Sequence, residues 1–197
     1  MMKFKNILLP TLTLAILVSA CGLTELDLLN DPSEVTADNV ELDLLYNNVV
    51  KEFADFVDEV SDETMPYVRM TAMDGGFQYF NQDGPGDFNF LWSQAYNNLM
   101  PDINLVLELA GEQGFTVHTG SAKIMQAYVL MSLVDVFGDI PYSEAFQGIA
   151  NPSPKADDDE AVYSVALGLL DEAIAELANP VSPPDFDPYY GGDATGW

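Results

Sequence analysis

Residues 74–90 bring together aromatic, amide and carboxylate side chains on glycine-rich chain that has neither helical nor strand periodicity. The candidate ligand-binding residues in this predicted surface loop are Asp74, Tyr79, Phe80, Asn81 and Asp83. Flat aromatic rings can stack on the C–H faces of a sugar, while amides and carboxylates bond its hydroxyl groups. The loop is therefore a candidate carbohydrate site. The alternative is that its aromatic side chains tuck under the loop as a small satellite core.

Catalytic and metal chemistry have little support in the sequence. The only histidine, His118, lies in a predicted connection at residues 114–120, where we expect exposure to solvent. Residues 157–160 are all acidic, and we expect them to complement the dipole of a following helix, because the regular ligand spacing of a metal site is missing. Adjacent acids such as Asp171 and Glu172 point apart on a helix and cannot flank a glycosidic bond. We expect no catalytic residue, metal or cofactor.

The N-terminal residues predict export and a lipid anchor. Two lysines, Lys3 and Lys5, precede a short apolar stretch, which ends in Val-Ser-Ala before Cys21, the only cysteine. Small residues before a cleavage point suit signal peptidase, and a cysteine directly after them is the pattern of a bacterial lipoprotein. The alternative is an ordinary secretory signal with a chance cysteine. The apolar stretch falls short of the ~20 residues of a membrane-spanning helix.

The charge excludes several partners. All 32 acidic residues but only four of the six basic ones lie beyond Cys21, so the net charge of that part is −28. Nucleic acid and anionic lipid surfaces would be repelled, and membrane attachment would depend on the lipid alone. Acidity also disfavours anionic polysaccharides, so a sugar ligand is expected to be a neutral oligosaccharide.

Four segments have helical periodicity, near residues 42–60, 87–110, 121–137 and 159–178. We expect Thr36 or Asp38 to cap the first, and Pro101 to kink or divide the second. In the second, Trp92 and Tyr96 share an apolar face and should pack in the core. The third is apolar on nearly all sides, which is typical of a central buried helix. No strand pattern appears, so the predicted fold class is all-α, with stacked antiparallel helix pairs.

The third and fourth segments, the turn between them and the C-terminal residues carry a sequence signature. Its parts are Ser121-Ala-Lys-Ile-Met-Gln-Ala-Tyr128, Leu133-Val-Asp-Val-Phe-Gly-Asp-Ile-Pro-Tyr-Ser-Glu-Ala145, Val162-Tyr163, Leu170-Asp-Glu-Ala173 and Tyr190-Gly-Gly-Asp-Ala-Thr-Gly-Trp197, with Asn30-Asp31-Pro32, Trp92 and Tyr96 ahead of them. Behind a lipoprotein signal, this order resembles the SusD/RagB family of Bacteroidetes outer-membrane lipoproteins, in particular its SusD-like, starch-binding-associated branch.

The resemblance covers nearly the whole chain, but family members continue for several hundred residues past the position of Trp197. We therefore expect an N-terminal part of the family domain. The predicted organisation is a signal peptide at residues 1–20, a lipidated tether at 21–35, and at 36–197 the N-terminal part of a SusD-like helical domain whose C-terminal part is absent.

The resemblance implies a non-enzymatic protein, lipid-anchored on the outer face of the outer membrane. Such proteins capture oligosaccharides or peptides and pass them to a TonB-dependent transporter of the SusC type. Their helices resemble tetratricopeptide units, and the turn at residues 138–142 would be structural. Two alternatives remain open from the residues themselves: a surface glycoside hydrolase, because carboxylates are abundant, and a helical scaffold without a small ligand.

Overall fold

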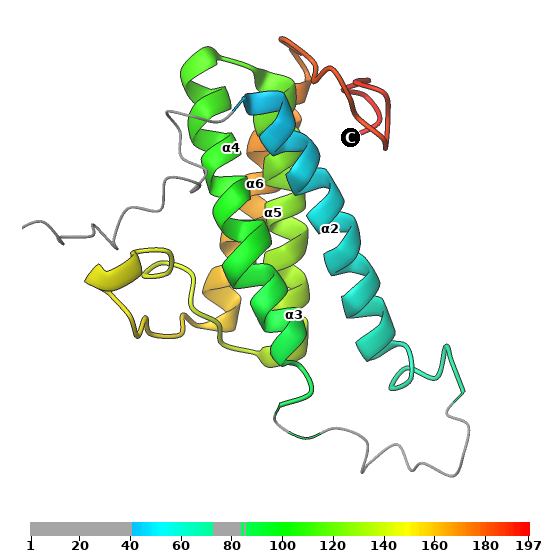
Figure 1. Ribbon diagram of the computed structural model, residues 1–197, viewed down its shortest axis with the longest axis vertical. Helices are drawn as coiled ribbons and strands as arrows, with labels where there is room; N and C mark the ends of the chain where they lie inside the picture. Colours follow the sequence, from blue (N-terminus) through cyan, green and yellow to red (C-terminus); the bar gives the residue numbers. More distant parts are fainter. Residues whose placement is uncertain (1–40, 73–83, 85) are drawn as a thin grey trace, which may run out of the picture. The chain divides into compact units, whose positions relative to one another are not determined.

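A computed structural model describes residues 41–72, 84 and 86–197, all within one compact unit, Ala37–Trp197. The elements are α2 (Leu42–Thr64), α3 (Asn89–Ser93), the π-helical segment η3 (Gln94–Leu99), α4 (Met100–Gln113), α5 (Thr116–Phe137), the 3₁₀ turn η4 (Gly148–Ala150) and α6 (Asp159–Leu177) (Figure 1). The described residues form no strand, only an isolated bridge between Ile140 and Asp157. The predicted all-α class is therefore confirmed.

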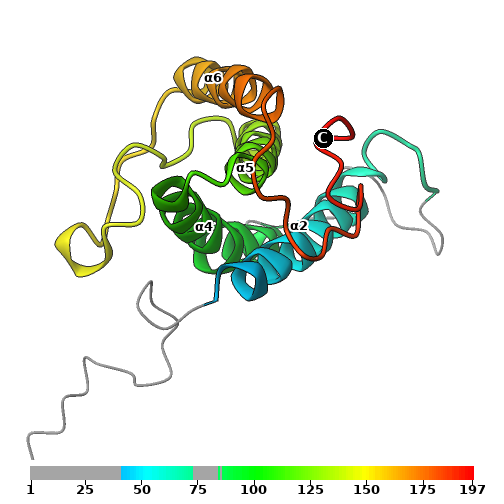
Figure 2. The same ribbon diagram turned by 90° about the horizontal axis from the view of Figure 1, so that it is seen from above.

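Helix α5 is the centre of this unit, as its apolar composition predicts. It packs against α6 on one side and against α4 and α2 on the other (Figure 2). Its buried residues come from every face of the helix: Val117, His118, Thr119, Gly120, Ser121, Ala122, Met125, Gln126, Ala127, Val129, Leu130, Leu133 and Val134. Helices α4, α5 and α6 alternate in direction, and each buries its apolar face on the next.

The helical segment around Pro101 is divided into two shorter α-helices, as the sequence predicts, but by a π-helical turn and not by a break in the backbone. Helical backbone runs without interruption from α3 through η3 into α4. Proline lacks an N–H group, and its ring would collide with the carbonyl four residues earlier in a regular α-helix. The π-helical turn directly before Pro101 widens the backbone and removes this conflict, since its hydrogen bonds reach five residues back, as from Met100 N–H to the Ala95 carbonyl.

The prediction for His118 is wrong. Helix α5 begins at Thr116, earlier than the periodicity indicates, so His118 lies in its first turn with only 2% of its surface exposed. Its Nε2 lies 3.0 Å from Asp43 Oδ1 in α2, and its Nδ1 lies 3.2 Å from the Ser182 carbonyl oxygen. His118 thus links α2, α5 and the C-terminal segment. The proposed caps of α2, Thr36 and Asp38, lie outside the described residues; the residue that precedes the helix is Glu41, which makes no side-chain cap bond.

Ion pairs and a hydrogen bond join α5 to α6. Lys123 Nζ bonds Glu176 at 2.6 Å and Glu172 at 2.8 Å, and Thr119 donates to Glu176 at 2.6 Å. Burial acts to lower the pKa of Lys123, but the bonds to the two glutamates outweigh it and hold that pKa above its usual value. Lys123 therefore stays charged at this half-buried interface.

The C-terminal segment is folded around one carboxylate. Asp187, 6% exposed, accepts hydrogen bonds from the backbone N–H groups of Tyr189, Tyr190 and Gly192 and from Trp197 Nε1. Burial favours the neutral acid, but these four donors prevail, and the pKa of Asp187 lies below its usual value. This explains the Gly-Gly-Asp…Trp signature as a local structural motif.

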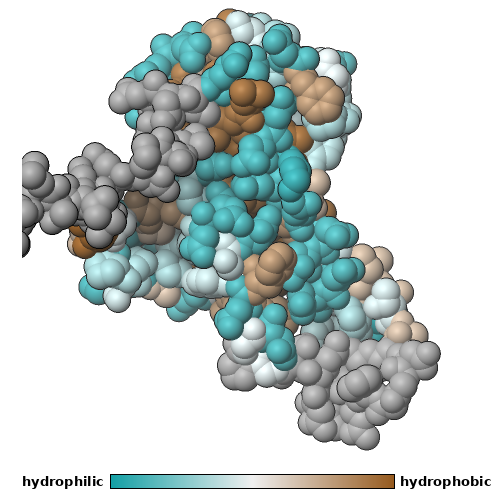
Figure 3. Space-filling model, viewed as in Figure 1, coloured by the Kyte–Doolittle hydropathy of each residue, from teal (hydrophilic) through white to brown (hydrophobic). Residues whose placement is uncertain are grey.

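Hydrophilic residues dominate the face shown in Figure 3, with hydrophobic residues at scattered places. This agrees with the strongly acidic composition. Within the described residues, no helix has the length and apolar character needed to cross a bilayer.

Two glycines give a test of the α5–α6 packing. A β-carbon on Gly120 would lie 2.7 Å from Leu177 Cγ, whereas one on Gly168 of α6 would meet nothing within 4 Å. Gly168→Ala should stabilise the fold by about 0.5–1 kcal/mol through helix propensity. Gly120→Ala gains the same propensity but overpacks the interface, so we expect a net loss of about 1 kcal/mol. Urea unfolding of both variants measures the difference, and equal effects would contradict the close approach.

Candidate functional site

One surface pocket combines stacked aromatic rings with amide side chains. We call it the aromatic–amide pocket, defined by Trp92, Tyr96, Asn97, Phe146, Gln147 and Asn151; its volume is about 470 Å³. Its first three residues come from α3 and η3, and the others from the chain that connects α5 to α6. Pro141, Ala145, Gly148, Pro152 and Pro154 complete its lining.

The three rings form a series in which Tyr96 is tilted against Trp92 and stacked with Phe146. The centroids of Trp92 and Tyr96 are 4.5 Å apart at 33°, and those of Tyr96 and Phe146 are 5.8 Å apart at 21°. Tyr96 donates from its hydroxyl group to the Pro141 carbonyl at 2.7 Å, which fixes the ring against the connecting chain. Burial, with a smaller contribution from the negative charge of Asp157, raises the pKa of Tyr96, so it remains a neutral donor.

Trp92 and Tyr96 serve the core and the pocket at once. Both are partly buried and pack against the hydrophobic core, as predicted, and Trp92 also meets the edge of Phe137 at 5.1 Å. Their contribution to the pocket wall was not predicted.

Phe146 is the exposed ring of the series. It is 41% exposed and has a φ of 62°, a left-handed conformation that is uncommon for a non-glycine residue. Such a conformation costs on the order of 1–3 kcal/mol and persists only where the surrounding chain enforces it. The surrounding chain therefore holds this large apolar ring at the wall of the pocket.

The backbone around Phe146 is constrained by the preceding turn at residues 137–143, Phe-Gly-Asp-Ile-Pro-Tyr-Ser. Gly138, with φ of 78°, ends α5 and redirects the chain. Asp157 then accepts hydrogen bonds from Ser143 Oγ at 2.6 Å and from the N–H groups of Ser143 and Tyr142 at 2.7 and 2.8 Å. The backbone N–H of Asp157 donates to the Ile140 carbonyl at 2.9 Å. The Ser143 hydroxyl and the two N–H groups lower the pKa of Asp157. The structural role predicted for this turn is confirmed.

Two further carboxylates order the connecting chain. Glu144 Oε2 accepts from Asn151 Nδ2 and from the Lys155 N–H group, both at 3.3 Å. Asp139 Oδ1 accepts the N–H of Asp159 at 3.1 Å, at the first turn of α6. The acidic run therefore serves the N-terminus of α6 as predicted, although the bonding carboxylate comes from the preceding turn. Asp139, Asp158 and Asp159 are all exposed.

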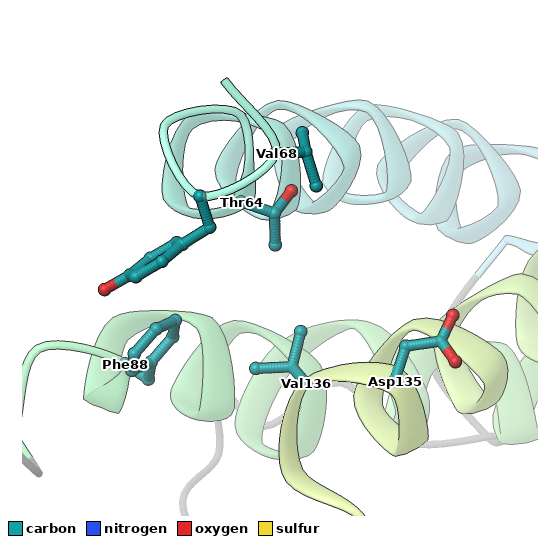
Figure 4. Close-up of a pocket in the computed structure, with 6 residues that line it drawn as sticks. Thr64, Val68, Phe88, Asp135 and Val136 are labelled. Atoms are coloured by element: carbon teal, nitrogen blue, oxygen red, sulfur yellow. The ribbon is translucent and has the colours of Figure 1, made fainter. Parts of the chain in front are cut away.

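Two other described pockets offer a poorer match to a sugar. One, of about 450 Å³, is lined by Thr64 at the end of α2, by residues just after α2 and just before α3, and by Asp135 and Val136 of α5 (Figure 4). Its carboxylate, Asp135, already accepts a bond from the Tyr163 hydroxyl group. The second, of about 460 Å³, is lined mainly by apolar side chains of α5, α6 and the C-terminal segment, among them Ile174 and Leu177.

The sequence-predicted binding residues Asp74, Tyr79, Phe80, Asn81 and Asp83 lie outside the described residues, as does Cys21. The aromatic–amide pocket was missed. Its sequence signal is an aromatic–amide pair, Phe146-Gln147, followed by Asn151 in the proline-rich connection between two helices.

Comparisons with known proteins agree with this arrangement. The model of a SusD-like family, described as starch-binding and associating with the outer membrane, matches residues 25–197. A SusD/RagB family protein from Bacteroides thetaiotaomicron is similar in structure, with a TM-score of 0.62 and 25% identity, over 79% of this chain and 35% of that one. A SusD homologue from Bacteroides fragilis has a TM-score of 0.54 and 24% identity, over 80% and 32%. No curated protein matches. The chain spans about one third of the length of these two structures.

The Asp157 bonds predict a pH-dependent pocket wall. Because the pKa of Asp157 is lower in the fold than the ~3.9 of an unfolded aspartate, its contribution is complete above about pH 4 and is lost as pH falls through the folded value. Asp157→Ala should reproduce that loss at neutral pH, since it removes both oxygens that accept from Tyr142 and Ser143. We expect faster amide exchange at Tyr142 and Ser143. Asp158→Ala removes a carboxylate that makes none of these bonds, and equal exchange in both variants would contradict the role of Asp157.

Proposed function

The chain belongs to the SusD-like family, and from that premise we propose that it is a non-enzymatic, lipid-anchored nutrient-binding protein of the outer membrane that captures a neutral oligosaccharide. It would pass this ligand to a TonB-dependent transporter of the SusC type and face the outside of the cell. The observation that carries the proposal is the aromatic–amide pocket, where a series of three neighbouring rings adjoins three amide side chains.

The composition of the pocket favours binding over hydrolysis. A glycoside hydrolase needs two carboxyl groups on either side of the scissile bond. The described residues that line this pocket include no Asp or Glu. Amides bond neutral hydroxyl groups without adding charge, whereas the −28 net charge beyond Cys21 would repel an anionic polysaccharide. A neutral oligosaccharide fits both features.

The loop with Asp74, Tyr79, Phe80, Asn81 and Asp83 would supply further contacts to the same class of ligand. Its aromatic and amide composition matches that of the pocket. Binding residues collect on connections held by rigid elements, and both this loop and the chain between α5 and α6 join helices.

The binding proposal is tested with a panel of neutral oligosaccharides: maltoheptaose, cellohexaose, xylohexaose and mannohexaose. Calorimetry on the full chain in detergent should show binding of at least one. Phe146→Ala removes an exposed stacking surface and should weaken that binding about tenfold, which corresponds to about 1.4 kcal/mol.

Phe186→Ala is the matched control, because Phe186 is also exposed, at 58%, but lines no pocket described above. Equal affinities of Phe146→Ala and Phe186→Ala for the oligosaccharide would exclude the aromatic–amide pocket as the binding site. Tyr79→Ala and Phe80→Ala test the loop in the same titration. Binding of none of the four oligosaccharides would refute the proposed ligand class, and release of sugar products would favour a hydrolase.

Anchoring is tested at Cys21. We expect mass spectrometry of membrane fractions to show a mature chain that begins at lipid-modified Cys21. Several acyl chains are needed, since one chain gives only marginal membrane affinity at ~0.8 kcal/mol per buried CH₂. Cys21→Ser should release the protein from the membrane fraction. Recovery of an unmodified Cys21 peptide from membranes would show that the anchor is absent.

A further inference from the structure

We propose that Asn97 is the residue by which the aromatic–amide pocket selects for a sugar hydroxyl group, and that the π-helical turn η3 is the device that presents it. The inference rests on the proposed function and deepens it. It assigns stacking to Phe146, the exposed ring of the series, and hydroxyl recognition to one amide beside it.

Helix geometry explains why a π-turn is needed. In an α-helix, residues four apart share a face, so Trp92 and Tyr96 would align while Asn97 would point well away from them. A π-helical turn closes over five residues instead of four. Tyr96 and Asn97, four and five positions after Trp92, then lie on either side of the helix face that carries Trp92. Both residues line the pocket.

The sequence supplies a physical cause for this turn. Pro101 has no N–H to donate, and its ring cannot lie against the carbonyl four residues earlier, which is that of Asn97. The Met100 N–H bonds the Ala95 carbonyl, five residues back, directly before the proline. The widened turn accommodates Pro101 and rotates Asn97 toward the pocket in the same step.

The chemistry of Asn97 suits a hydroxyl group. One amide N–H is taken by Ser93 Oγ, to which Nδ2 donates at 2.9 Å, and this bond fixes the side chain. The second N–H and the amide oxygen retain their capacity to bond a hydroxyl as both donor and acceptor. Asn151, the pocket's other asparagine, directs its Nδ2 to Glu144. A site built to bond a hydroxyl discriminates strongly against ligands that lack it.

The neighbouring residue is a matched control. Asn98 lies in the same π-turn, is also exposed, and likewise donates its Nδ2 to a residue four positions earlier, Gln94, at 3.2 Å. It does not line the pocket. Asn97→Ala and Asn98→Ala therefore remove the same group and one equivalent bond, and they differ only in what faces the pocket.

The experiment titrates the full chain and its variants with maltoheptaose, cellohexaose, xylohexaose and mannohexaose. Asn97→Ala should lower the affinity for the best-bound oligosaccharide about tenfold, and it should reduce the differences in affinity among the four sugars. Asn98→Ala should change neither the affinity nor these differences.

Equal effects of Asn97→Ala and Asn98→Ala, with binding by the unaltered chain intact, would overturn this inference and leave the proposed function standing. A retained preference among the four oligosaccharides in Asn97→Ala would also overturn it. Absence of binding by the unaltered chain would instead refute the proposed function, and this inference with it.

Discussion

The fold depends on the burial of a single helix, α5, on nearly all its sides. An apolar helix cannot present a polar face to water, so α2, α4 and α6 must cover it together. This constraint explains why polar groups at its surface are paired across helices. Ser121 lies 2.9 Å from the Tyr46 hydroxyl group, Gln126 donates to Asn104 at 2.9 Å, and His118 meets Asp43 and the Ser182 carbonyl. Each pairing offsets the cost of placing a polar side chain in the core.

The end of α5 determines where the aromatic–amide pocket can form. Gly138 stops the helix, and Asp157 and Glu144 fix the chain that returns to α6. This chain holds Phe146 outward beside Tyr96, which belongs to the helix that covers the other side of α5. A buried helix and its fixed exit thus bring residues about fifty positions apart in the sequence to one surface. Trp92 and Tyr96 retain contact with the core, so this side of the pocket is held on a rigid base.

The pocket differs in character from the surface around it. The chain is strongly acidic, yet the described residues that line this pocket are aromatic, amide, small apolar or proline. An uncharged recess on an anionic surface favours uncharged ligands, and this agrees with the description of the SusD-like family as starch-binding. The chain spans about one third of each solved relative, so the proposed pocket accounts for one region of a larger family architecture.

The sequence by itself determined the helical class, the central position of α5, the stop at Gly138 and the family, because periodicity and glycine or proline signals are local properties of the chain. It also predicted the core packing of Trp92 and Tyr96. It could not predict the burial of His118, since that follows from bonds to Asp43 and Ser182, 75 and 64 positions away. Nor could it predict the aromatic–amide pocket. The relation of Phe146 to Tyr96 exists only after α5 is covered and Asp157 has fixed the returning chain, and the position of Asn97 depends on how the folded helix accommodates Pro101. Local pattern specified the elements, and long-range contacts decided which side chains meet.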